Sequence, residues 1–100
     1  MARITTLWWR DIPAQVIAGA GRRAVKVQLS PRFAEAIDRA AMRAGLAGED
    51  DYLAAWRRLD EGEGGDAEAR AAALEAEWPR ERLHRTALAG GIEAHAKVEE

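Results

Sequence analysis

One extended stretch near the start of the chain most constrains the fold. Residues 4–29, ITTLWWRDIPAQVIAGAGRRAVKVQL, are the part that is rich in β-branched and aromatic residues and alternates as strands do. The segments after it have helical periodicity and many alanines. We therefore expect an α+β domain in which the later helices pack against a sheet built by this stretch.

Three strands are predicted within the stretch. Residues 4–9 form the first, and residues 10–13 interrupt it with a bend or an edge, because the residue before a proline avoids the helical region. Residues 14–18 form the second strand, and Gly19-Ala20-Gly21 supplies the positive φ angles of a tight hairpin. Residues 23–29 form the third strand. The sequence thus predicts a three-stranded antiparallel β-meander at the N-terminus.

The faces of the third predicted strand are clearly separated. Val25, Val27 and Leu29 share one face, and the other face consists of Ala24, Lys26 and Gln28. Such alternation is typical of a strand with one buried face. Successive side chains of a strand alternate in direction, so Trp8 and Trp9 of the first strand are expected to point to opposite faces. One of them can then be a core residue, and the other needs separate cover from a helix, the C-terminal tail or another protein.

Three to four helices are predicted after the meander, packed on it. The first begins at Ser30-Pro31 with a serine cap and ends at Gly45-Leu46 in a Schellman-type stop. A second helix opens at Gly48 to Asp51 and carries an apolar stripe of Tyr52, Leu53, Trp56 and Leu59. Residues 60–65, DEGEGG, are acidic and glycine-rich and predict a mobile loop.

A long helix of alanine and glutamate is predicted from Asp66. Pro79 either kinks this helix or begins a new one that presents Leu83 and Leu88, and Gly90-Gly91 ends it. The domain is expected to cover residues 1–91, and residues 92–100 are expected to be a flexible C-terminal tail.

Composition excludes several classes of function. The chain has no cysteine, which excludes disulfides, thiolate catalysis and cysteine-ligated metal sites and fits a reducing cytoplasm. No stretch has the length and apolarity of a signal peptide or a membrane span, so we expect a soluble protein without a membrane partner. Alanine makes up 23 of the 100 residues, so the four tryptophans must carry much of the burial.

Charge is distributed unevenly along the chain. Residues 1–45 carry eight Lys/Arg against three Asp/Glu, whereas residues 46–100 carry seven against fourteen. This asymmetry either steers a charged partner or is neutralised within the fold.

Motifs for catalysis or cofactor binding are weak. Residues 19–24, GAGRRA, match the G-x-G-x-x-A pattern of dinucleotide sites, but a strand follows where that site needs a helix N-terminus. His84 and His95 lack metal-ligand spacing, and the acidic clusters at residues 49–51 and 60–63 lack the alternation of a calcium loop. We therefore predict no catalytic residue, no metal and no cofactor, and an enzyme is disfavoured.

The most unusual local chemistry is Trp8-Trp9-Arg10-Asp11. Two indoles beside a guanidinium can form a binding hot spot, for which tryptophan and arginine are the enriched residues. The alternative is that both indoles belong to the core and that Arg10 and Asp11 form a surface pair. The sequence does not decide between these.

A family resemblance runs through residues 8–58. WWRDIPAQV, followed by a basic hairpin, then RFAEAIDRAAMRAG and YLAAWRR, resembles the small bacterial "virulence factor" family, a domain shared with conserved virulence factor C-type proteins. The resemblance implies a stand-alone accessory protein, found in company with folate and corrinoid one-carbon enzymes. It implies no catalytic residues.

Two functional hypotheses follow. The first is a non-catalytic protein-interaction or accessory module that docks on another protein through the strand edge and residues Trp8, Trp9, Arg10 and Asp11. The alternative is a nucleic-acid binder that uses an exposed tryptophan for stacking beside the cations Arg10, Arg22, Arg23 and Lys26.

Overall fold

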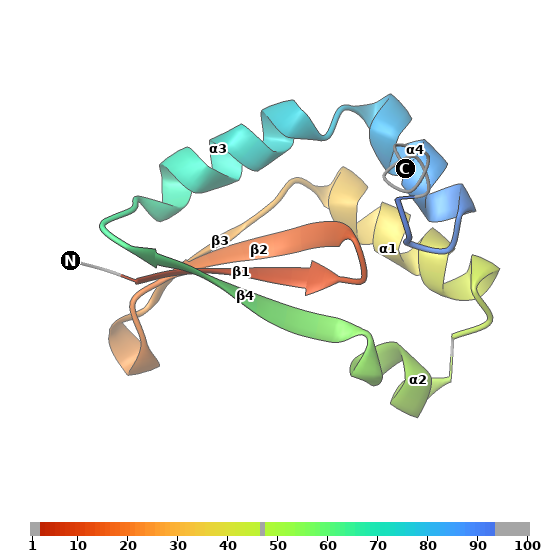
Figure 1. The fold of residues 1–100 in the computed structure, drawn as a ribbon, viewed down its shortest axis with the longest axis horizontal. Coiled ribbons are helices and arrows are strands. Elements are labelled where there is room, and N and C mark those ends of the chain that lie inside the picture. Colours follow the sequence, from red (N-terminus) through yellow and green to blue (C-terminus); the bar gives the residue numbers. More distant parts are fainter. Residues whose placement is uncertain (1–2, 47, 94–100) are drawn as a thin grey trace, which may run out of the picture.

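One four-stranded antiparallel sheet and four α-helices make up the part of the chain that the computed structural model describes, residues 3–46 and 48–93 (Figure 1). The predicted α+β class is confirmed. The elements, in chain order, are β1 (Arg3–Trp9), β2 (Ile12–Ala18), the 3₁₀ turn η1 (Gly21–Arg23), β3 (Val25–Gln28), α1 (Pro31–Arg43), α2 (Glu49–Ala54), β4 (Trp56–Glu63), α3 (Ala67–Glu77) and α4 (Arg80–Leu88).

The sheet has the strand order β3-β2-β1-β4. Its first three strands are the predicted meander, with Ile4 opposite Ala18 at one end of the β1–β2 pair and Trp9 opposite Ile12 at the other. The register shifts between Leu7 and Trp8, which is typical of a β-bulge. The bend expected at residues 10–13 is confined to a two-residue turn at Arg10 and Asp11, where Arg10 adopts a positive φ of 53°. Ile12 and Pro13 were wrongly assigned to the interruption, because both belong to β2 and pair with β1.

The fourth strand corrects the prediction for residues 55–65. We expected a helix through Leu59 and then a mobile loop, but α2 ends at Ala54 and β4 continues to Glu63. In β4, Trp56 pairs with Trp9 of β1 and Leu59 pairs with Thr6. The free edge of β1 offers a row of backbone N–H and C=O groups, and pairing with that row overrides the helical spacing of the apolar residues.

The first helix begins and ends as predicted, but its N-cap differs. Leu46 N–H donates to the carbonyl oxygen of Ala41 at 2.8 Å, the hydrogen bond of a Schellman stop. The Ser30 hydroxyl does not cap the helix. It donates to Oε1 of Glu75 at 2.9 Å, and the Ser30 N–H donates to Oε2 at 2.7 Å. A carboxylate of α3 therefore holds the junction between β3 and α1.

The two alternatives at Pro79 are resolved. α3 ends at Glu77, and Pro79 occupies the N-cap position of a separate helix, α4. Of the predicted tail, residues 94–100 lie outside the described part of the chain. Glu93 is described, and its N–H donates to Oδ2 of Asp11 at 2.7 Å while its carboxylate binds Arg82.

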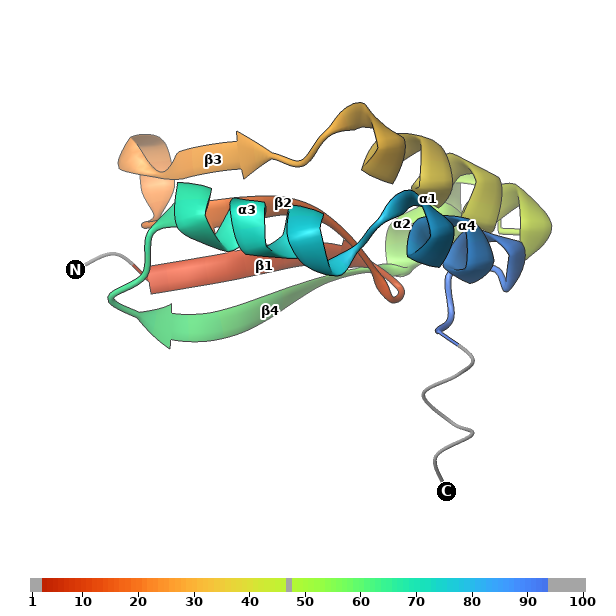
Figure 2. The same ribbon diagram turned by 90° about the horizontal axis from the view of Figure 1, so that it is seen from above.

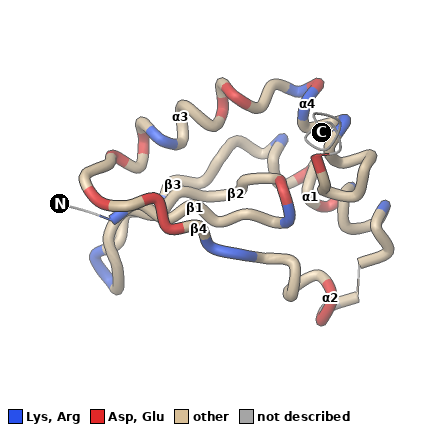
Figure 3. The backbone as a smooth tube through the Cα atoms, in the orientation of Figure 1, with Lys and Arg blue, Asp and Glu red and all other residues tan. Residues whose placement is uncertain are grey.

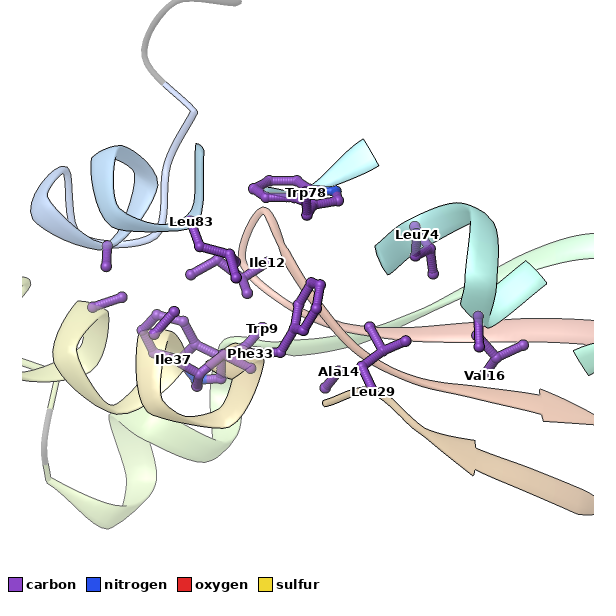
Figure 4. Close-up of a cluster of buried hydrophobic side chains, with 14 of the residues drawn as sticks. Trp9, Ile12, Ala14, Val16, Leu29, Phe33, Ile37, Leu74, Trp78 and Leu83 are labelled. Carbon is purple, nitrogen blue, oxygen red and sulfur yellow. The ribbon is translucent and has the colours of Figure 1, made fainter. Parts of the chain in front are cut away.

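The helices leave one side of the sheet bare. α3 lies along one face, whereas α1 and α4 pack against each other beyond the end of the sheet where β1 turns into β2 (Figures 1 and 2). The core lies between α3, the sheet and this helix pair, and its largest fully buried side chains include Trp9, Ile12, Val16, Phe33, Leu74 and Trp78 (Figure 4). No helix in the described part of the chain is both long and apolar enough to cross a bilayer.

Candidate interaction surface

The turn at Arg10 and Asp11 is held by hydrogen bonds to two other segments of the chain. The Arg10 N–H donates to Ala55 O at 3.1 Å, and its guanidinium donates to Gly90 O at 2.9 Å. The Asp11 N–H donates to Gly91 O at 2.8 Å. The turn thus joins the end of α4 to the start of β4, and these polar groups already have partners within the molecule.

The two neighbouring indoles have different surroundings. Trp9 is completely buried, and its Nε1–H donates to the carbonyl oxygen of Tyr52 at 2.9 Å. Trp8 is half-buried, with its ring 6.4 Å from that of Trp78 and the Arg57 guanidinium 5.9 Å from its centroid. Trp9 is therefore a core residue, and Trp8 packs against α3 and β4.

The basic residues of the hairpin lie at the other end of the sheet. Arg22 and Arg23 are exposed in η1, and Lys26 is exposed in β3 (Figure 3). Because β1 and β2 are antiparallel and pair along their whole length, the hairpin and Arg10 are at opposite ends of that pair (Figure 1). The structure therefore separates the seven predicted site residues into two groups and does not bring Arg10 beside the hairpin.

The side of the sheet away from α3 is not covered by any described helix (Figure 2). We call it the open face, and it consists of two rows of cross-strand neighbours. One row runs across Lys26, Ile17, Thr5 and Asp60, and the other across Gln28, Gln15, Leu7 and Arg58. None of these residues belongs to the apolar cluster beneath the helices. Ile17, which is only 6% exposed, and half-buried Leu7 lie at the centre of the open face, and polar and charged groups surround them.

A depression of about 500 Å³ lies at the hairpin end of the open face. Its lining includes Arg3, Arg58 and Lys26, with Thr5 and Ile17 between them. Lys26 and Arg58 form no ion pair or side-chain hydrogen bond with any described residue. Both cations are therefore available to an anionic group from outside the chain.

The single carboxylate of the open face is already engaged. Asp60 accepts hydrogen bonds of 2.7 Å from Arg3 and one of 3.0 Å from the Gly62 N–H. The Arg3 hydrogen bond, followed by that of Gly62, lowers the pKa of Asp60 below its ordinary value. Asp60 therefore stays ionised and paired, and it does not neutralise Lys26 or Arg58.

Sequence reasoning identified Lys26 but missed most of the open face. The alternation in residues 23–29 already placed Lys26 and Gln28 on one side, and strand pairing would have added Gln15 and Ile17. Arg58 could not be placed, because its segment has the apolar spacing of a helix. Arg3 lies next to the predicted first strand and was not considered.

A second concave region lies between α1 and α4. This groove, of about 640 Å³, is lined by three arginines, two glutamates and a histidine: Arg32, Glu35, Arg39, Arg80, Glu81 and His84. Its charges are mixed, and the described residues contain no group of three or more His, Asp or Glu side chains arranged to hold a metal ion. The groove is lined by charged side chains of both signs without a recognisable catalytic set.

Comparison with known proteins gives a family and no closer relative. No curated protein and no solved structure matches the chain. Residues 7–86 match the family described as "Virulence factor", and this match extends the resemblance seen in residues 8–58 through α3 and most of α4. Since the match covers most of the chain, this protein belongs to the virulence factor family.

Proposed function

We propose that this protein is a non-catalytic interaction module, an accessory that docks through its open face onto an acidic surface of another protein. The observation that carries the proposal is the unpaired Lys26 and Arg58 on a sheet face that the helices leave bare. We therefore propose docking through the open face instead of through Trp8 to Asp11, where it was expected from the sequence.

Charge complementarity sets the chemistry of the partner. Lys26 and Arg58 lie on the open face, Arg22 and Arg23 extend the positive region at the hairpin, and the carboxylate of Asp60 is held by Arg3. Burying these cations against a neutral surface would leave them desolvated and unpaired, which is costly. Carboxylates on the partner remove that cost and favour both the docking orientation and the rate of association.

The composition of the open face suits a protein partner. Ile17 and Leu7 lie at its centre, flanked by the amides of Gln15 and Gln28, and charged groups lie at its margins. Protein interfaces commonly have this arrangement of an apolar centre and a polar rim. Because Ile17 is already buried in the free chain, we expect the unpaired Lys26 and Arg58 to contribute more to binding than the apolar centre.

The nucleic-acid alternative is less well supported. Sequence-tolerant binding of single strands uses aromatic side chains on which bases stack. The open face carries no aromatic residue, Trp9 is buried, and Trp8 packs beneath Trp78. The exposed Arg22 and Arg23 still provide a basic patch, so the test below includes a nucleic acid.

The experiment is affinity purification of the tagged chain from its native cells, comparing wild type with Lys26→Glu. Arg85→Glu on α4 is the control, because Arg85 is exposed, forms no described ion pair and undergoes the same change of charge. We expect a stoichiometric protein partner that Lys26→Glu loses and Arg85→Glu keeps. The one-carbon enzymes that the family resemblance suggests are the first candidates for that partner.

Two results would contradict the proposal. One is a partner that both variants retain equally, which would place docking elsewhere. The other is binding of a 20-nucleotide oligo-dT strand that Lys26→Glu abolishes and that weakens steeply with salt, because this would support the nucleic-acid alternative.

A further inference from the structure

The outer edge of β4 is an unpaired strand edge. β4 is the last strand in the order β3-β2-β1-β4 and is eight residues long, and no strand of the described residues lies beyond it (Figure 1). Such an edge presents a row of N–H and C=O groups to any second strand that fits beside it. In β4 the Gly62 N–H is already bound to Asp60 and the register against β1 shifts between Arg3 and Thr5, so the regular part of the edge is residues 56–60. Leu59, in the middle of β4, is 44% exposed.

The charges of β4 are segregated along the strand. Arg57 and Arg58 precede Leu59, whereas Asp60, Glu61 and Glu63 follow it. An antiparallel copy of the same strand therefore brings its acidic half beside the basic half of the first. We propose that the edge of β4 pairs with the β4 edge of a second copy of this chain, in a two-fold symmetric dimer centred on Leu59.

The charge pattern selects one register. With Leu59 opposite Leu59 of the second copy, Arg58 lies opposite Asp60 and Arg57 opposite Glu61, and the symmetry repeats each pair. Moving the centre by one residue, to Asp60 or Arg58, places like charges opposite each other on the axis. Cross-strand like charges are destabilising, so the alternative registers are penalised.

The Arg58–Asp60 pair contributes most to this complementarity. Arg58 forms no described ion pair, and Asp60, although bound by Arg3, is 58% exposed and has acceptor capacity left. Arg57 is 55% exposed and donates to the carbonyl oxygen of Arg10. Glu61 contributes less, because Arg70 and Thr6 already bind it and it is 19% exposed.

Charged side chains on an edge strand usually prevent pairing with another strand. In β4, the order of positive and negative residues along the strand decides whether pairing is prevented. A single sign along an edge repels every copy of itself in every register. In β4 the two signs occupy different halves, so repulsion occurs in the wrong registers and attraction in one. The dimer joins two four-stranded sheets into one continuous sheet with both open faces on the same side. This inference does not depend on the proposed function, for which the dimer leaves Lys26 as the unpaired cation of the open face because Arg58 is then bound by Asp60 of the second copy.

The test is a charge-swap experiment followed by size-exclusion chromatography with light scattering. The wild-type chain is expected to shift with increasing concentration from 11.0 kDa towards twice that mass. Arg58→Glu and Asp60→Arg, each alone, place like charges across the axis and are expected to remain monomeric. An equal mixture of the two variants restores both opposite-charge pairs and is expected to regain the dimer.

Arg85→Glu is the control, because Arg85 is exposed on α4, away from β4, and dimerisation should be unchanged. Circular dichroism establishes that each variant is folded. If a variant is not folded, hydrogen exchange of the wild type gives a second test: the β4 amides are expected to be better protected at high than at low protein concentration. The inference is overturned if the wild type stays at 11.0 kDa up to about 1 mM, the weak end of measurable affinity. It is also overturned if the mixture stays monomeric.

Discussion

Replacing Trp9 by alanine tests whether this indole holds the core together. Trp9 is completely buried, and its Nε1–H donates to the Tyr52 carbonyl. Large-to-small substitution of a buried tryptophan costs about 3–5 kcal/mol of unfolding free energy. A domain of this size has roughly 5–15 kcal/mol in total, so the variant loses a large part of its stability.

Trp8→Ala is the matched comparison. Trp8 is half-buried, so we expect its loss to cost about 1–2 kcal/mol, roughly half the value of burying a large apolar side chain fully, plus the lost ring contact with Trp78. Trp9→Phe keeps most of the volume but leaves the Tyr52 carbonyl without its donor, which costs about 1–3 kcal/mol.

Urea denaturation followed by circular dichroism measures the three variants on one scale, provided that the slope of free energy against urea is unchanged. The expected order of destabilisation places Trp9→Ala well above Trp8→Ala. The reasoning is refuted if Trp9→Ala unfolds within about 1 kcal/mol of wild type, because a buried indole cannot be removed at so small a cost.

Two further predictions concern other contacts. Gly91→Ala is expected to destabilise the fold by about 1–3 kcal/mol, because a Cβ there would lie 2.9 Å from Cζ3 of Trp9. Gly62 has the same φ of +93°, but a Cβ added there would meet no atom within 4 Å. Gly62→Ala therefore carries the backbone strain without the steric clash, and the difference between the urea midpoints of the two variants gives the cost of the clash. Arg3→Gln removes the main cause of the lowered pKa of Asp60, so that pKa should rise. The stability that ionised Asp60 contributes is present above its unfolded pKa and lost as pH falls through the lower folded value. A carbon-13 titration of the Asp60 carboxyl that is identical in both proteins would contradict the ion pair.

The sequence predicted the elements whose signals are local. The alternation of residues 23–29 identified β3, but the strand is shorter, Val25–Gln28, because a connection of residues 19–24 with a 3₁₀ turn replaces the expected tight hairpin. Pro31 and Gly45 marked the ends of α1, and Pro79 marked the boundary of α4. In each case the deciding residue constrains its own backbone or that of its neighbours. Local chemistry therefore determined where these segments begin and end.

The features that were missed depend on contacts between distant segments. Trp56 and Leu59 continue the helical spacing of the residues before them, and residues 60–63 are acidic, so no local signal marks residues 56–63 as a strand. They become one by pairing with the free edge of β1, for example through Trp9 and Trp56, which are 47 residues apart. The Ser30 hydroxyl binds Glu75, which lies 45 residues later, so a cap rule applied to neighbours could not find its partner. Alternation showed that Trp8 and Trp9 differ, but their burial depends on where α2 and α3 pack.

The most direct test of the docking surface is the chemical reactivity of Lys26. The chain has two lysines, Lys26 and Lys97, so amine labelling reports on these side chains and on any free N-terminal amine, and peptide mass spectrometry separates Lys26 from the others. After co-purification with the partner, Lys26 is expected to react much more slowly in the complex than in the free chain, because it is exposed in the free structure and becomes buried on docking. Equal reactivity of Lys26 in the free and bound protein would contradict the open face as the site of docking.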